Sequence, residues 1–312
     1  MEYKRLGESG LKVSMVGLGC NNFGRRCDLS DTRTIVHAAL DEGINFFDTA
    51  DIYGGSGQSE ILLGKALRGI DRSQFIIGTK FANPMGDGAF SRGASRGYII
   101  KAIEDSLNRL GMDYIDLYQQ HVPDADTPIE ETIRVLDDLV RMGKVRYTGH
   151  SNFAGWQIAD AAWTARTLGL NSFSSAQNLY RLLDQRVSRE VIPACQQFKL
   201  GLLPYFPLAS GMLTGKYIRG EAPASGSRLA NMGDRGLAAL HDSAFDRLEQ
   251  YQRFAQDAGR SILELAMSWL ASQDIVSSVI SGATSAMQVK QNVQAAKWKL
   301  SEPDLIEIGK LS

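Results

Sequence analysis

A regular alternation of short apolar runs and longer amphipathic stretches is the feature that most constrains the fold of this chain. Eight short runs are typical of buried strands, at residues 15–19, 44–49, 75–80, 114–120, 145–150, 174–178, 201–206 and 276–281. Each is followed by a stretch with helical periodicity, at residues 31–43, 58–68, 95–110, 128–142, 154–168, 185–199, 242–258 and 285–297. Such alternation indicates parallel strands joined by helical crossovers. Eight units favour a closed (β/α)8 barrel over an open doubly wound sheet.

Three segments depart from this alternation. Residues 3–14 form two short strand-like runs around a Gly/Ser turn, which predicts an N-terminal β-hairpin. Residues 208–241 predict a long loop after the seventh strand, and loops of this length in compact domains are usually functional or disordered. Residues 298–312 predict a tail with a short helix. Because no low-complexity linker interrupts the pattern, we expect one domain over residues 1–312.

The open-sheet alternative would require a phosphate-binding turn after the first strand. Gly17 and Gly19 begin a GxGxxG pattern, but Asn22 stands at the position of the third glycine and no helix follows directly. A GxG fragment alone is weak evidence, and a Rossmann fold is therefore rejected.

Composition restricts the partners and the compartment. Lys plus Arg number 34 against 35 Asp plus Glu, so the net charge of −1 gives no support for a nucleic acid or an anionic membrane as a partner. Three cysteines without a CxxC pattern favour reduced thiols. The first residues lack the apolar core of a signal peptide, and no run of about 18 apolar residues could span a bilayer. We expect a soluble, cytoplasmic protein, and the sequence does not indicate its oligomeric state.

Ionisable side chains stand at the ends of three consecutive predicted strands. Asp48 ends one run and Tyr53 follows on the next loop, Lys80 ends the next run, and His121 ends the third. The C-terminal strand ends of a barrel converge on one face, where active sites form. We therefore expect these four side chains to be neighbours in space.

This combination of side chains suits proton transfer to a carbonyl oxygen. The reference pKa of tyrosine is about 10, and a nearby lysine ammonium lowers it, which would make Tyr53 a proton donor and acceptor. Asp48 would hold Lys80 charged and oriented, and His121 would hydrogen-bond the reacting oxygen. Alone, each residue is more often structural. Their joint placement favours catalysis of carbonyl reduction or alcohol oxidation.

The sequence lacks the residue patterns that two other reaction classes, acyl transfer and metal-dependent hydrolysis, require. No nucleophile stands next to a base, so acyl transfer is unsupported. The four histidines are spread apart, and we expect no metal site.

Several ordered motifs make the chain resemble a known family, the aldo-keto reductases. The motifs are FDTADIYG at 47–54, GTK at 78–80, DYIDLYQQHVPD at 113–124, GHSN at 149–152, QNLY at 177–180, PYFPL at 204–208, LTGKY at 213–217 and ISGAT at 280–284, followed by Gln288 and Asn292. The resemblance extends from about residue 3 to residue 297. Each motif alone is modest evidence, but the ordered set is highly specific.

The resemblance implies a barrel that reduces small aldehydes or ketones with NADPH, or with NADH as an alternative, and without a metal. It also implies that Tyr53 is the general acid, with Asp48, Lys80 and His121 completing a tetrad. Tyr205 would stack on the nicotinamide, and Ser151, Asn152 and Gln177 would surround its carboxamide. The other cofactor positions that it implies are Gly19, Cys20, Asn21, Phe206, Pro207, Leu208, Ser210, Lys216, Arg228, Gly282, Thr284, Gln288, Gln291 and Asn292.

One departure from the family pattern bears on the choice of cofactor. Some branches of the family have basic residues where this chain has Gly282 and Gln288. The 2′-phosphate of NADPH would then be bound by hydrogen bonds or by a base elsewhere, and Arg228 and Lys216 are the candidates. With a single charge-assisted contact, discrimination against NADH is expected to be weaker.

The substrate pocket and one functional alternative stay open. Phe23 and Phe81 would give an apolar wall, whereas Asn22 and Arg92 would favour a polar or anionic substrate. Potassium-channel beta subunits share the fold and tetrad of the family, so a cofactor-bound regulatory protein is the alternative to an enzyme.

Overall fold

A computed structural model describes residues 1–88, 90–234, 236 and 240–311 of the chain. Parts of the predicted loop at 208–241, and the final residue of the predicted tail, lie outside these residues. The described part of the loop contains two short 3-10 helices, η3 (Ala209–Thr214) and η4 (Ala230–Met232).

Eight parallel strands form one sheet in the order β10-β3-β4-β5-β6-β7-β8-β9. The strands are β3 (Val16–Gly19), β4 (Phe46–Asp48), β5 (Ile76–Phe81), β6 (Ile115–Gln120), β7 (Val145–Ser151), β8 (Ser175–Gln177), β9 (Gly201–Leu202) and β10 (Val279–Gly282). Parallel bridges from Leu202 to Val276 and from Tyr205 to Ile280 join the two edges of the sheet. The predicted (β/α)8 barrel is therefore confirmed.

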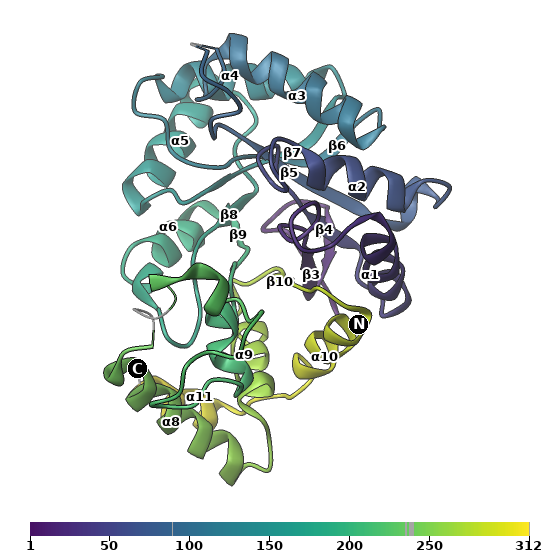
Figure 1. Ribbon diagram of the computed structural model, residues 1–312. Coiled ribbons are helices and arrows are strands. Elements are labelled where there is room, and N and C mark those ends of the chain that lie inside the picture. Colours follow the sequence, from purple (N-terminus) through teal and green to yellow (C-terminus); the bar gives the residue numbers. More distant parts are fainter. Residues whose placement is uncertain (89, 235, 237–239, 312) are drawn as a thin grey trace.

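Helices lie around the outside of the sheet (Figure 1). They are α1 (Leu29–Asp41), α2 (Gln58–Leu67), α3 (Arg96–Leu110), α4 (Ile129–Arg141), α5 (Gly155–Leu168), α6 (Val191–Phe198), α8 (Asp242–Asp257), α9 (Ile262–Ala271), α10 (Ala286–Ala295) and α11 (Glu302–Lys310), with short 3-10 turns η1 (Arg72–Gln74) and η2 (Arg186–Ser188). The amphipathic α4 shows the general rule, since its buried residues include Ile133, Leu136 and Leu139, at intervals of three. Among the described residues, no helix has the length and hydropathy to cross a bilayer.

The predicted N-terminal hairpin is present as β1 (Tyr3–Arg5) paired with β2 (Lys12–Ser14). Leu6 and Val13 of this hairpin are fully buried in one apolar cluster with barrel residues such as Phe46, Leu117 and Leu203. The hairpin therefore fills the end of the barrel interior opposite the C-terminal strand ends.

Three elements differ from the sequence prediction. The seventh strand was expected at 201–206, but β9 has two residues, because Pro204 has no N–H to donate to the sheet. The helix expected at 185–199 is divided into η2 and α6. Helix α9 was not predicted.

Neighbouring strands are in register at their C-terminal ends. Gly19 pairs with Asp48, which in turn pairs with Gly78, and Lys80 pairs with Gln119. Ser151 pairs with Gln177 on the other side of the barrel. This register places the polar residues of several strands at one level of the barrel.

Candidate active site

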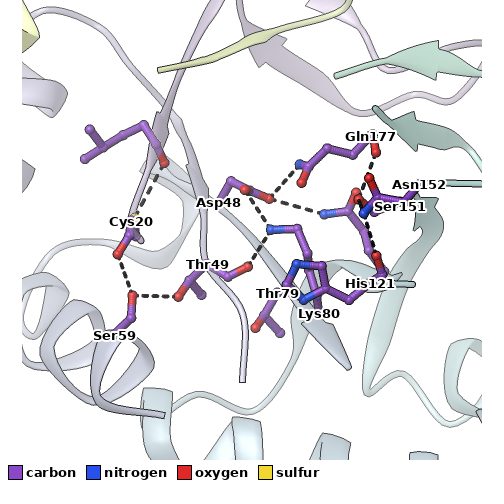
Figure 2. Close-up of polar contacts among 12 residues, drawn as sticks. Cys20, Asp48, Thr49, Ser59, Thr79, Lys80, His121, Ser151, Asn152 and Gln177 are labelled. Atoms are coloured by element: carbon purple, nitrogen blue, oxygen red, sulfur yellow. Dashed lines mark hydrogen bonds and ion pairs between the residues drawn. The ribbon is translucent and has the colours of Figure 1, made fainter. Parts of the chain in front are cut away.

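An ion pair between Lys80 and Asp48 lies at the centre of the C-terminal face of the barrel. Lys80 Nζ donates to Asp48 Oδ2 at 2.7 Å and to the carbonyl oxygen of Thr49 at 2.8 Å (Figure 2). The side chains are 0% and 4% exposed. Burial lowers the pKa of Lys80, but the Asp48 carboxylate and Tyr53 outweigh it and the net direction is upward. The site therefore holds Lys80 as an ammonium, as the sequence predicted.

Tyr53 lies beside this ion pair on the loop after β4. Lys80 Nζ is 5.0 Å from the centre of the Tyr53 ring. Burial raises the pKa of the Tyr53 phenol, and Lys80 opposes this effect without cancelling it. The sequence predicted that Lys80 would lower this pKa. The direction of the lysine effect is as expected, but the net pKa is raised, because burial disfavours a phenolate. Tyr53 is thus held protonated.

His121 follows β6 and faces Tyr53. The two ring centres are 5.6 Å apart with an edge-to-face angle of 81°. Burial, together with the Lys80 charge, lowers the pKa of His121 to about 3. Its Nδ1 has no hydrogen-bond partner among the described residues. A neutral imidazole at this position can offer one N–H to a bound oxygen.

Two glutamines orient the carboxylate, Gln119 from β6 and Gln177 from β8. Gln177 Nε2 donates to Asp48 Oδ1 at 3.0 Å, and Gln119 Nε2 donates to the same oxygen at 3.3 Å. The sequence analysis assigned Gln177 to the cofactor and missed Gln119. Gln119 lies two residues before His121 along a buried strand, so its side chain points to the same face as that of His121. This spacing is the sequence signal that could have identified Gln119.

A cavity of about 600 Å³ opens above these side chains, hereafter the smaller cavity. It is lined by Asp48, Tyr53 and His121 of the predicted tetrad. It is also lined by the predicted cofactor residues Gly19, Asn21, Ser151, Asn152, Gln177, Tyr205, Phe206, Arg228 and Gly282. Tyr205 Oη donates to Asn152 Oδ1 at 2.8 Å, which fixes the ring at the cavity wall.

A larger cavity of about 910 Å³ shares Phe206, Arg228 and Gly282 with the smaller one. The remaining predicted cofactor residues other than Cys20 line it: Pro207, Leu208, Ser210, Lys216, Thr284, Gln288, Gln291 and Asn292. Phe206 and Ser210 have φ angles of 51° and 57°. Such strain in non-glycine residues clusters at ligand sites. The two cavities form a continuous groove from Tyr53 to the N-terminal end of α10.

The groove fits a dinucleotide with several phosphates. Arg26, Lys216, Arg228 and Lys290 line the larger cavity, and none of them forms an ion pair within the described part of the chain. The single carboxylate in its lining, Glu264, is already bound to Arg260. The cavity is therefore cationic, as a phosphate site requires.

Several predicted residues lie away from the groove. Cys20 was expected to contact the cofactor, but its side chain is fully buried in the core and lines neither cavity. The carbonyl oxygen of Cys20 accepts a hydrogen bond from Ser59 Oγ at 2.8 Å (Figure 2). Phe23 and Phe81 are likewise 0% exposed, so neither forms the apolar wall that the sequence suggested. Both side chains belong to the main hydrophobic core instead, and the Phe81 ring lies 4.8 Å from the ring of Tyr118 on β6.

The polar candidates for the substrate pocket also change. Asn22 lines the larger cavity, and Arg92 lines neither cavity. Arg25, which the sequence analysis missed, lines the smaller cavity instead. Within the described residues, no group of three His, Cys, Asp or Glu side chains is placed to hold a metal ion.

Comparison with known proteins gives one consistent result. Residues 15–312 match the model of the aldo/keto reductase family. A probable voltage-gated potassium channel subunit beta from Oryza sativa subsp. japonica is 38% identical over 95% of this chain and 91% of its own length. L-glyceraldehyde 3-phosphate reductase from Escherichia coli (strain K12) is 34% identical over 95% and 87%. Versiconal hemiacetal acetate reductase from Aspergillus parasiticus is 32% identical over 98% and 95%. The chain belongs to the aldo/keto reductase family.

Proposed function

We propose that this protein reduces small aldehydes or ketones to alcohols with NADPH, using Tyr53 as the proton donor. Membership of the aldo/keto reductase family indicates an oxidoreductase. The observation that carries the proposal is the buried Lys80–Asp48 ion pair beside Tyr53, at the mouth of a groove of dinucleotide size.

The residues of the site divide the work of the reaction. The bound nicotinamide would supply the hydride to the carbonyl carbon. Tyr53 donates a proton to the carbonyl oxygen as negative charge develops there, and its raised pKa keeps that proton in place beforehand. Lys80 stabilises the phenolate that remains, and Asp48 keeps Lys80 oriented toward it. His121, neutral under ordinary conditions, donates a hydrogen bond that orients the carbonyl oxygen.

The cofactor residues would act by position and charge. Asn152 and Tyr205, linked by their 2.8 Å hydrogen bond, would hold the nicotinamide in the smaller cavity. Lys216 and Arg228 would bind the phosphates in the larger cavity. Thr284 and Gln288 would line the adenosine end, where the N-terminus of α10 favours negative charge.

The test is a comparison of two variants that each lose one hydroxyl from the same cavity. Consumption of NADPH is followed by its absorbance with a panel of small aldehydes and ketones. Tyr53→Phe should lower kcat by about 10²- to 10⁴-fold, the usual contribution of a general acid. Tyr205→Phe keeps the aromatic ring and should lower kcat far less than Tyr53→Phe does. NADPH fluorescence should report that both variants still bind the cofactor. Equal turnover by Tyr53→Phe and the unaltered protein would refute the assignment.

A second candidate function follows from the comparison with the rice relative, which is named as a probable channel subunit. A cofactor-bound regulatory protein would bind NADPH with the same groove. It would give no steady-state turnover with any carbonyl of the panel, and Tyr53→Phe would change nothing. The panel therefore separates the two candidates directly.

A further inference from the structure

We propose that Arg25 binds an anionic group of the substrate, so that the preferred substrates are aldehydes or ketones carrying a carboxylate or a phosphate. This inference rests on the proposed function and deepens it. Two consecutive arginines, Arg25 and Arg26, follow the first barrel strand and line different cavities. Arg25 lines the smaller cavity with Tyr53 and His121, whereas Arg26 lines the larger cavity with Lys216.

The turn that carries Arg25 is rigidly built. The carbonyl oxygen of Asn22 accepts hydrogen bonds from the backbone N–H groups of Arg25, Arg26 and Cys27, at 3.2, 2.9 and 3.2 Å. Phe23 and Cys27, which flank the arginines, are buried in the core at 0% and 3% exposure. The backbone of Arg25 is therefore fixed although its side chain is exposed.

The same turn packs directly against the loop that carries Tyr53. A Cβ atom added to Gly24 would lie 3.2 Å from Gly54 Cα, and one added to Gly54 would lie 2.5 Å from the carbonyl oxygen of Phe23. Both glycines have positive φ angles, 79° and 76°. The two backbone segments come together here, with Gln58 Cβ beside both glycines, and neither position has room for a side chain. As a result, Arg25 stands next to the proton donor.

The charge of Arg25 is free to act on a ligand. Among the described residues, no carboxylate forms an ion pair with it. Asp48, the one carboxylate that lines the smaller cavity, is already paired with Lys80 at 2.7 Å. Arg228 lines both cavities and its charge would be matched by the cofactor phosphates. Arg25 is then the unmatched cation that faces the reacting end of the groove.

The remaining space determines where the anion lies. With the predicted cofactor residues of the lining against the dinucleotide, the rest of the lining consists of Arg25, Asp48, Ile52, Tyr53, Gly54, Gly55, His121 and Ile280. Tyr53 and His121 bind the carbonyl oxygen. A substrate that places its carbonyl there shares the smaller cavity with Arg25. A guanidinium binds carboxylate and phosphate through two parallel N–H groups, which neutral groups do not match.

The test compares matched pairs of substrates that differ in charge. One pair is 4-carboxybenzaldehyde and its neutral methyl ester, and the other is glycolaldehyde phosphate and glycolaldehyde. We expect kcat/KM to be higher for the anionic member of at least one pair, and the pair that responds identifies the anion. The exposed position of Arg25 makes the expected preference about 2- to 5-fold, and it should decrease with added salt.

Variants assign the preference to one side chain. Arg25→Met should lower the ratio of anionic to neutral kcat/KM by about 2- to 5-fold, and Arg25→Lys should restore part of it. Arg26→Met, the neighbouring control, should leave that ratio as it is. The inference is overturned if the unaltered protein shows no charge preference, or if Arg25→Met lowers both kcat/KM values equally.

A binding measurement separates failure of this inference from failure of the proposed function. Calorimetry with 4-carboxybenzyl alcohol and benzyl alcohol needs no turnover, and is carried out with and without NADP+. Tighter binding of the carboxylate, lost in Arg25→Met, supports the anion site even if no carbonyl is reduced. Equal binding of the two alcohols excludes a carboxylate as the bound anion, even if neutral aldehydes are reduced, and together with equal kcat/KM for the two glycolaldehydes it contradicts the anion site.

Discussion

Substitutions in the buried ion pair of Lys80 and Asp48 should affect the stability of the protein and its activity in different ways. Lys80→Met removes the ammonium and leaves Asp48 buried at 3% exposure, with only the two glutamine amides as donors. Removing one partner of a buried ion pair costs about 3–5 kcal/mol, because the remaining charge is uncompensated. Asp48→Asn should cost a comparable amount by leaving Lys80 unpaired. In the double variant neither charge remains, so at least about 2 kcal/mol should be recovered relative to the sum of the single losses.

Urea unfolding followed by circular dichroism measures these free energies, and NADPH oxidation is measured on the same samples. The double variant should be more stable than Lys80→Met and still inactive, because no ammonium remains to stabilise the Tyr53 phenolate. The exposed pair Lys101–Asp105 of α3, with side chains 64% and 41% exposed, is the matched control. The same comparison of single and double variants of Lys101 and Asp105 should give an interaction free energy of about 0.3–0.5 kcal/mol. A double variant of the active-site pair no more stable than Lys80→Met would refute the reasoning.

Three further predictions concern the cofactor and two buried ionisable groups. Arg228→Ala should raise the KM for NADPH much more than the KM for NADH in steady-state assays; equal changes would mean that Arg228 does not bind the 2′-phosphate. Burial lowers the pKa of His150 to about 3, while the unfolded chain takes up this proton near pH 6.5, so stability falls as the pH drops through that window. Between pH 7 and pH 4, the free energy of unfolding of His150→Leu, measured by urea titration, should therefore fall by about 3 kcal/mol less than that of the unaltered protein. Equal falls for the two proteins would contradict this. Burial raises the pKa of Asp51 to about 7, so its ionisation destabilises the fold as the pH rises from about 4 to 7. Between pH 5 and pH 8, the free energy of unfolding of Asp51→Asn should rise by about 2 kcal/mol relative to that of the unaltered protein. If the difference between the two free energies does not change with pH, ionisation of Asp51 is excluded as the cause.

The sequence predicted the barrel and the gathering of the tetrad because both depend on strand ends. Strands are marked by short apolar runs, and the parallel topology brings their C-terminal ends together whatever the details of packing. Asp48, Lys80 and His121 could therefore be placed side by side from three separate segments. The cofactor positions came from the resemblance to the aldo-keto reductases instead, and all of them except Cys20 line one of the two cavities.

Features that depend on side-chain direction could not be predicted in this way. Helix α9 lacks a polar face, since the consecutive residues 265–270, which cover more than one turn, are all buried, so its periodicity is weak. The net pKa of Tyr53 depends on how completely it is buried, which no local pattern shows. Arg25 was missed because its role depends on contact between two loops that are about 30 residues apart, one on each side of α1.

The hairpin at the barrel floor has a consequence for how the chain is synthesised. Ser277 Oγ donates to the carbonyl oxygen of Arg5 at 2.9 Å, and Ser278 Oγ donates to that of Ser14 at 2.7 Å, across sequence separations of 272 and 264 residues. The hairpin is therefore synthesised 264 to 272 residues before the serines that bind it. Until then its apolar residues, Leu6 and Val13, have no barrel interior to enter. The nascent chain thus exposes an apolar segment until the barrel strands have been synthesised. Chaperones act on growing chains in this situation.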